Sequence, residues 1–167
     1  MIRTLPAPQS LIIGTFLLLL AGAFAASPLP LVYKSLGILF TTYWVFSVGG
    51  PPLAYLSALV IPLIGLIGGD VNWLIMLPIV MTSYLMAVLG LEYAWRYPAL
   101  IVSPLLSFVP QFIAFQLSQR DLFAINLPWE PASSWVGLHA LVALAGSLIV
   151  IYFDRRREKL LEANEST

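Results

Sequence analysis

The sequence predicts an all-α, polytopic integral membrane protein with six transmembrane helices in a single domain. Of its 167 residues, 60% are hydrophobic and only 10% are charged, and the mean hydropathy is +0.93. A soluble domain has about 25% charged residues, which keep its surface hydrated. In a bilayer the backbone groups of an apolar segment need partners within that segment, so these segments are expected to be helices.

Six apolar runs, separated by turn residues or charges, are long enough to cross the hydrocarbon core. The first run follows Arg3 and ends at Ala23-Phe24-Ala25, a pattern that is also typical of a cleavable signal peptide. Because the chain is numbered from Met1, we interpret this run as a retained transmembrane helix. The predicted spans are residues 11–26, 31–48, 52–67, 73–93, 98–116 and 135–153, and residues 154–167 form a charged tail.

Residues 49–93 predict a transmembrane helical hairpin around which the other helices pack. Its two apolar runs are joined by Gly68-Gly69-Asp70, a connection so short that the two helices are expected to be antiparallel neighbours. Asp70 follows two glycines and is interpreted as a solvated acid of this turn. Pro62 and Pro78 each remove a helical hydrogen bond and permit a kink, so the two helices are candidates for framing a cavity.

The distribution of basic residues predicts that both termini lie in the cytoplasm. With the N-terminus inside, the inner loops and tail carry more basic residues than the outer loops, as the positive-inside rule requires. Lys34 stands near the start of the second span, where its side chain is expected to snorkel to the membrane surface. We therefore expect a multi-pass protein of the cell (inner) membrane, in contact with the lipid bilayer. The inner residues are Arg3, Arg96, Arg155, Arg156, Arg157 and Lys159, and the outer residues are Lys34 and Arg120.

Groups that could carry out chemistry are few. The chain has no cysteine, which excludes thiol catalysis, disulfides and cysteine–metal sites. His139 is the only histidine and has no partner ligands at metal or haem spacing, so we predict an interhelical hydrogen bond for it. Phosphate-binding loops, nucleophile elbows and acid–base carboxylate pairs are missing from the sequence. We expect no enzymatic activity, no cofactor and no metal, and the net charge of zero gives no reason to expect nucleic acid binding.

Residues 36–93 resemble the rod shape-determining protein family MreD. Members often carry a Tyr-Trp-like pair late in the second span, a glycine-rich start to the third, and an acid after it. The similar residues here are Tyr43-Trp44, Gly49-Gly50, Gly65-Leu66 and Asp70. The resemblance implies a non-enzymatic scaffold that binds a bitopic MreC-like partner in the cell-elongation and peptidoglycan-synthesis machinery, and so helps to control cell shape. The surface expected to bind the partner comprises Tyr43, Trp44, Gly49, Gly50, Asp70 and Trp129.

The same stretch also resembles the membrane substrate-binding subunit of energy-coupling-factor vitamin transporters, particularly the biotin type. In that family a Gly-Pro-x-x-x-Tyr-Leu segment begins a helix, as Gly50-Pro51 and Tyr55-Leu56 do here. This resemblance implies a six-helix architecture similar to that of the MreD family, and the alternative function of a solute-binding transporter subunit. Its pocket is expected to be lined by Tyr55, Tyr84, Gln111 and Gln116. A further alternative is an accessory subunit that only packs within a larger membrane complex.

Overall fold

The computed structural model describes residues 8–94, 97–119, 128 and 132–165, and within them the chain is helical. These residues contain no β-strand, which confirms the predicted all-α class. The elements are α1 (Pro8–Ala26), α2 (Leu31–Ile64), the short 3₁₀ helix η1 (Gly65–Gly68), α3 (Val71–Tyr93), α4 (Ala99–Gln119) and α5 (Ala132–Glu165).

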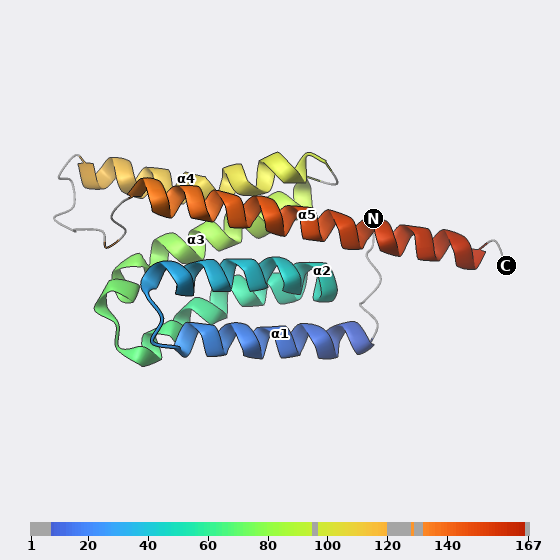
Figure 1. Ribbon diagram of the computed structural model, residues 1–167, viewed down its shortest axis with the longest axis horizontal. Helices are drawn as coiled ribbons and strands as arrows, with labels where there is room; N and C mark the ends of the chain where they lie inside the picture. The colour runs from blue at the N-terminus through green and yellow to red at the C-terminus, as the bar shows by residue number, and fades with distance from the viewer. Residues whose placement is uncertain (1–7, 95–96, 120–127, 129–131, 166–167) are drawn as a thin grey trace.

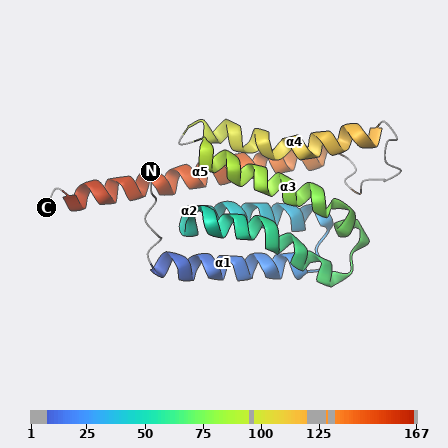
Figure 2. The same cartoon turned by 180° about the vertical axis from the view of Figure 1, so that it is seen from behind.

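Gly50 divides α2 into two halves that run in opposite directions. Its backbone angles are φ 78° and ψ −177°, a conformation that is open essentially to glycine alone. The hydroxyl oxygens of Thr42 and Ser57 are 2.9 Å apart although 15 residues separate them, whereas a straight helix would hold them about 22 Å apart. The chain therefore reverses at Gly50, and both views show the two halves of α2 side by side (Figures 1 and 2).

A second reversal connects η1 to α3 at the opposite end of the bundle. Gly69 adopts the left-handed conformation with φ 65°, and the Asp70 carboxylate accepts a hydrogen bond of 3.0 Å from the backbone N–H of Asn72. Asp70 is thus the N-cap of α3, which agrees with its interpretation as an acid of the turn. The turn is held by Trp73, whose indole N–H donates to the Pro62 carbonyl oxygen at 2.8 Å.

The helices form a bundle in which α2, α3 and α5 pack between two flanking helices. Helix α1 packs chiefly on α2, and α4 packs on α3 and α5, so that α1 and α4 lie on opposite flanks (Figure 1). The start of α1 and the end of α5 lie at the same end of the bundle. Helix α5 has 34 residues and extends beyond the other helices at that end.

The outer surface of the bundle is suited to a membrane. Five of the described helical segments are long and apolar enough to cross one when residues 31–68 are counted together. Large apolar side chains point outward from them, among them Leu19 on α1 and Ile101 on α4, which are 69% and 70% exposed. Exposed apolar area costs about 25 cal/mol per Å² in water, and lipid tails remove that cost. The architecture indicates an integral membrane protein.

Candidate functional site

A buried hydrogen-bond network joins three helices at the side chains of Ser35, Tyr84 and His139. The Ser35 hydroxyl oxygen on α2 lies 2.7 Å from the Tyr84 hydroxyl on α3 and 2.8 Å from His139 Nε2 on α5. None of the three side chains is more than 2% exposed. The interhelical hydrogen bond predicted for His139 is therefore confirmed, and its partner is Ser35.

The orientation of the His139 ring follows from its second contact. Its Nδ1 lies 2.8 Å from the backbone carbonyl oxygen of Trp135, and a carbonyl only accepts, so Nδ1 carries the proton. In the neutral ring Nε2 is then an acceptor, and the Ser35 hydroxyl donates to it. The Trp135 ring also stacks on the imidazole, with ring centroids 4.4 Å apart.

A serine hydroxyl donating to a histidine nitrogen at this distance resembles an activated nucleophile. Ser35 is 0% exposed, however, and its hydroxyl also contacts Tyr84. A substrate cannot reach such a hydroxyl without displacing these helices. The arrangement is therefore suited to fixing α2, α3 and α5 against one another, because polar side chains in apolar surroundings strongly favour interhelical hydrogen bonds.

Tyr43 is the centre of a second interhelical network. Its hydroxyl lies 2.7 Å from that of Ser103 on α4, and Ser103 in turn donates to the Ala87 carbonyl oxygen on α3 at 2.9 Å. Because this bond uses the only proton of the Ser103 hydroxyl, Tyr43 must be the donor to Ser103. Gly146 on α5 faces the Tyr43 ring so closely that a Cβ atom there would come within 2.3 Å of it. Tyr43 thus contacts α4 and α5 directly and is linked to α3 through Ser103.

The remaining residues expected to bind a partner also have roles within the chain. Trp44 is half-buried and packs edge-on against Phe153, with ring centroids 5.6 Å apart. Gly49 is buried, and a Cβ atom there would lie 2.5 Å from the Leu53 side chain. Gly50 makes the reversal in α2 and Asp70 caps α3, as described above, while Trp129 lies outside the described residues. Partner binding by this set stays a prediction.

The four residues expected to line a solute pocket have different hydrogen-bond partners. The Tyr55 hydroxyl donates to the Glu92 carboxylate, whereas Tyr84 belongs to the Ser35 network. Gln111 is buried, and its side-chain oxygen has no hydrogen-bond partner among the described residues. Gln116 is half-buried. A pocket formed by these four residues also stays a prediction.

Lys34 differs from its expected position at the membrane surface. It is only 3% exposed, and its ammonium nitrogen lies 5.3 Å from the centroid of the Trp73 ring. Trp73 is itself fixed by its hydrogen bond to Pro62. Among the described residues no carboxylate pairs with Lys34. Sequence position could not reveal this burial, because Trp73 reaches Lys34 only through the packing of α3 on α2.

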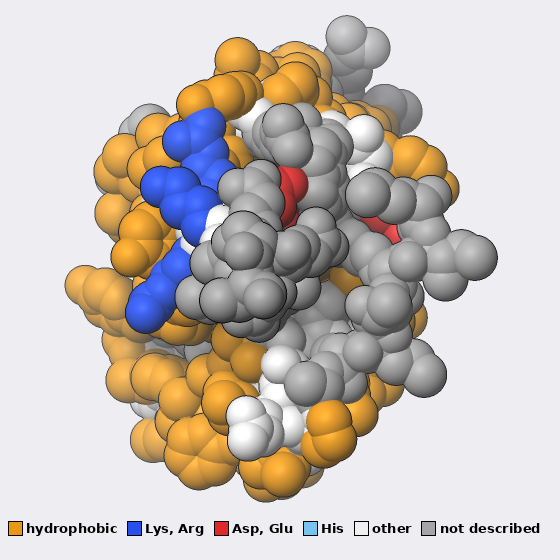
Figure 3. Space-filling model, turned by 90° about the vertical axis from the view of Figure 1, so that its right-hand side faces the viewer, with side chains coloured by type: hydrophobic (Ala, Val, Ile, Leu, Met, Phe, Trp, Pro, Cys, Tyr) orange, Lys and Arg blue, Asp and Glu red, His pale blue; other side chains and the backbone are white. Residues whose placement is uncertain are grey.

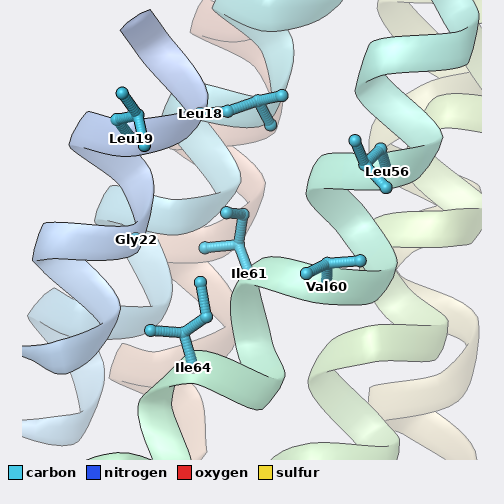
Figure 4. Close-up of a pocket in the computed structure, with 7 residues that line it drawn as sticks. All are labelled: Leu18, Leu19, Gly22, Leu56, Val60, Ile61 and Ile64. Carbon is cyan, nitrogen blue, oxygen red and sulfur yellow. The ribbon is translucent and has the colours of Figure 1, made fainter. Parts of the chain in front are cut away.

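An apolar groove opens between α1 and the second half of α2 (Figure 4). It has a volume of about 350 Å³, and every lining residue is apolar. None of the residues expected to bind a partner or a solute lines it, and Leu56 is the one lining residue that belongs to a motif quoted from the sequence. No pattern in the sequence marks the groove, because its apolar lining residues do not differ in type from the other apolar residues of the same two helices. The lining residues are Leu18, Leu19, Gly22, Leu56, Val60, Ile61 and Ile64.

No protein-family model, curated protein or solved structure matches this chain. Within the part of the chain that the structure describes, no three His, Cys, Asp or Glu side chains come together as a possible metal site. The two hydrogen-bond networks, the buried Lys34 and the apolar groove are therefore the features from which a function can be inferred.

Proposed function

We propose that this protein is a non-enzymatic membrane scaffold that binds the single transmembrane helix of a bitopic partner. The observation that carries the proposal is the open apolar groove between α1 and α2. The hydroxyls of Ser35, Tyr43 and Tyr84, by contrast, are buried and bonded between helices of the chain itself. An apolar surface of this kind binds by van der Waals packing, which is the main force between helices in a membrane.

The proposal includes six spans with both termini in the cytoplasm. The reversal at Gly50 leaves two segments, residues 31–49 and 51–68, that are about 27–29 Å long and so close to the thickness of the hydrocarbon core. The basic residues Arg155, Arg156 and Lys159 belong to the last part of α5, and α5 ends at the same end of the bundle where α1 begins (Figure 1). The positive-inside rule favours placing that end in the cytoplasm.

The composition of the groove favours a helix as its occupant. Its apolar walls offer no hydrogen-bond donor or acceptor that could orient a polar solute, whereas ligand pockets usually contain a few such groups. Gly22 lies among the lining residues, and small residues let a neighbouring helix approach closely. In the MreC-like case that the sequence resemblance implies, the partner helix would position an extracytoplasmic domain beside the peptidoglycan-synthesis machinery of cell elongation.

Site-specific photocrosslinking tests this proposal in intact cells. A crosslinking amino acid at Val60, in the groove, is expected to attach to the transmembrane helix of one bitopic protein, and the same amino acid at Ile101 on α4 is not. The matched variants Leu19→Trp and Ile12→Trp change side chains of α1 that are 69% and 70% exposed, but only Leu19 lines the groove. Leu19→Trp should reduce the crosslink at least tenfold, and Ile12→Trp should leave it unchanged. Equal crosslinking with both variants, or no crosslink from Val60, would overturn the proposal.

One observation favours a second candidate, the solute-binding transporter subunit. Lys34 is buried without a carboxylate among the described residues, so a solute carboxylate is a suitable partner for its ammonium group. This candidate predicts that biotin, which carries a carboxylate, raises the thermal stability of the purified protein, because a ligand that binds only the folded state stabilises it. A melting temperature unchanged at saturating biotin in both wild type and Lys34→Met would count against this candidate and leave the scaffold proposal intact.

A further inference from the structure

Helix α5 is longer than a membrane crossing requires. Its 34 residues extend over about 51 Å, compared with about 30 Å for the hydrocarbon core. The segment of it that is long and apolar enough to cross a membrane is Ser134–Arg156, and the C-terminal part of α5 extends beyond the other helices (Figures 1 and 2). One part of α5 is therefore placed at the membrane surface and beyond it.

The surface part of α5 carries a basic face, which comprises Tyr152, Arg155, Arg156 and Lys159. These positions follow the i, i+3, i+4, i+7 spacing that puts side chains on the same side of a helix. They line a hollow of about 580 Å³ together with Glu158. Figure 3 shows the blue Lys and Arg side chains as one row at this end of the molecule, bordered by hydrophobic side chains. The residues that line the hollow include three cations and one carboxylate, so their net charge is two positive charges.

A neighbouring turn holds Arg155 in place. The guanidinium carbon of Arg155 lies 4.7 Å from the ring centroid of Tyr97, a residue of the turn that precedes α4. The guanidinium also donates a hydrogen bond to the Tyr97 hydroxyl. This contact orients the side chain in advance of any ligand. A guanidinium group has five N–H donors, so the bond to Tyr97 leaves others available.

Exposed tyrosines indicate where this face lies relative to the membrane. Tyr93, Tyr97 and Tyr152 are each more than 60% exposed near this end of the bundle, and exposed tyrosines are enriched at membrane–water interfaces. From Tyr152, Arg155 and Arg156 lie about 5 Å farther along the helix and Lys159 about 10 Å farther. The headgroup layer begins at the edge of the hydrocarbon core and is about 5–8 Å thick. Arg155 and Arg156 are thus at the level of lipid phosphates, and Lys159, one turn farther along, can extend its long side chain back to that level.

We propose that the basic face of α5 binds the headgroup phosphate of an anionic glycerophospholipid. The planar guanidinium groups of Arg155 and Arg156 match phosphate oxygens in a bidentate geometry, and Lys159 adds a flexible point charge. The hydrophobic side chains that border the row suit the acyl chains of the same molecule. A headgroup with net negative charge is favoured over a zwitterionic one. The reason is that the one carboxylate of the lining offsets only one of its three positive charges, so the lining as a whole attracts anions.

Native mass spectrometry of the full chain tests the inference by counting bound lipids. The probes are phosphatidylglycerol and phosphatidylcholine with identical acyl chains, added to the delipidated protein in detergent. We expect at least a tenfold preference for phosphatidylglycerol in the wild type and less than a twofold preference in the triple variant Arg155→Gln, Arg156→Gln, Lys159→Gln. The matched pair of single variants is Arg156→Gln, which should lower the preference, and Arg156→Lys, which keeps the positive charge at the same position and should retain most of it.

Three outcomes would overturn the inference. They are equal occupancy by the two lipids in the wild type, a preference that the triple variant retains, and stabilisation by inorganic phosphate alone that matches the effect of phosphatidylglycerol. The last outcome would assign the basic face to a free anion. The substituted side chains are exposed, so the variants should fold, and thermal unfolding verifies this. As a measurement that needs no variant, the wild-type preference should fall between 50 and 500 mM NaCl, because salt screens exposed charges.

Discussion

Single buried hydroxyl groups connect helices that are distant in the sequence. Ser35 contacts Tyr84 across 49 residues and His139 across 104. Removing this hydroxyl takes away two contacts at once and leaves the acceptor nitrogen of His139 buried without a partner. A buried polar group that loses its hydrogen bond destabilises a protein more than the bond itself stabilised it.

Ser35→Ala should therefore lower the free energy of unfolding by about 1–2 kcal/mol. The measurement is reversible unfolding of the detergent-solubilised protein, followed by helix content as a denaturing detergent is added. Ser118→Ala is the matched control, because among the described residues the Ser118 hydroxyl bonds only to the Phe115 carbonyl of its own helix. Its effect should stay within about 0.5 kcal/mol. Equal effects of the two substitutions would show that the Ser35 network does not stabilise the bundle.

Lys34→Met should raise the free energy of unfolding in anion-free detergent. A cation over an aromatic ring gains about 0.5–2 kcal/mol, whereas burying a charge costs several kcal/mol unless it is paired. Methionine keeps much of the side-chain volume and removes the charge, so the desolvation term dominates the outcome. A clear loss of stability would instead indicate that the ammonium group has an anionic partner, in line with the solute-binding candidate.

At the scale of the elements, two reversals determine which helices become neighbours. The one at Gly50 places Thr42 beside Ser57, and the one at Gly69 starts α3 next to the end of α2. Both glycines have positive φ angles, but only Gly50 combines this with an extended ψ of −177°. A residue with a Cβ atom is strained in that region, whatever space surrounds it.

Gly50→Ala should lower the free energy of unfolding by about 1–3 kcal/mol. Space is not the cause, since the nearest atom to an added Cβ would be 3.9 Å away. Gly137→Ala is the matched control, because this glycine is helical and nothing lies within 4 Å of an added Cβ atom. The control should gain about 0.5–1 kcal/mol through its higher helix propensity. Substitutions of the same chemistry should thus have opposite signs, and a shared sign would contradict the account of Gly50.

For the whole molecule, the six-span arrangement makes a prediction about the two ends of the bundle. The last part of α5, which contains Arg156, and the turn from η1 to α3, which contains Gly68, lie at opposite ends of the bundle (Figure 1), and both residues are exposed. The chain has no native cysteine, so an introduced thiol is the only one available for labelling. Arg156→Cys should react with a membrane-impermeant maleimide only in inverted vesicles, and Gly68→Cys only in intact cells or spheroplasts. Labelling of both positions from the same side would exclude an arrangement in which α3, α4 and α5 all cross the membrane.

The sequence by itself determined the properties that depend on local composition. Apolar runs predicted the all-α class, since lipid-embedded backbone must bond within its own segment. The two glycines before Asp70 predicted a turn, and the acid caps the helix that follows. The lone His139 predicted an interhelical hydrogen bond, because a polar side chain in an apolar span needs a partner.

Only the tertiary structure decided which partners these residues have. Ser35 and Tyr84 are ordinary polar residues of apolar helices until packing brings them to His139, and nothing around Lys34 in the sequence indicates that Trp73 will cover it. The groove likewise arises from the packing of α1 on α2, which brings apolar side chains of both helices to its walls. Hydropathy varies along the chain on the scale of one helix, whereas these contacts join residues far apart in the sequence. Their geometry is therefore determined by the packing of the whole bundle.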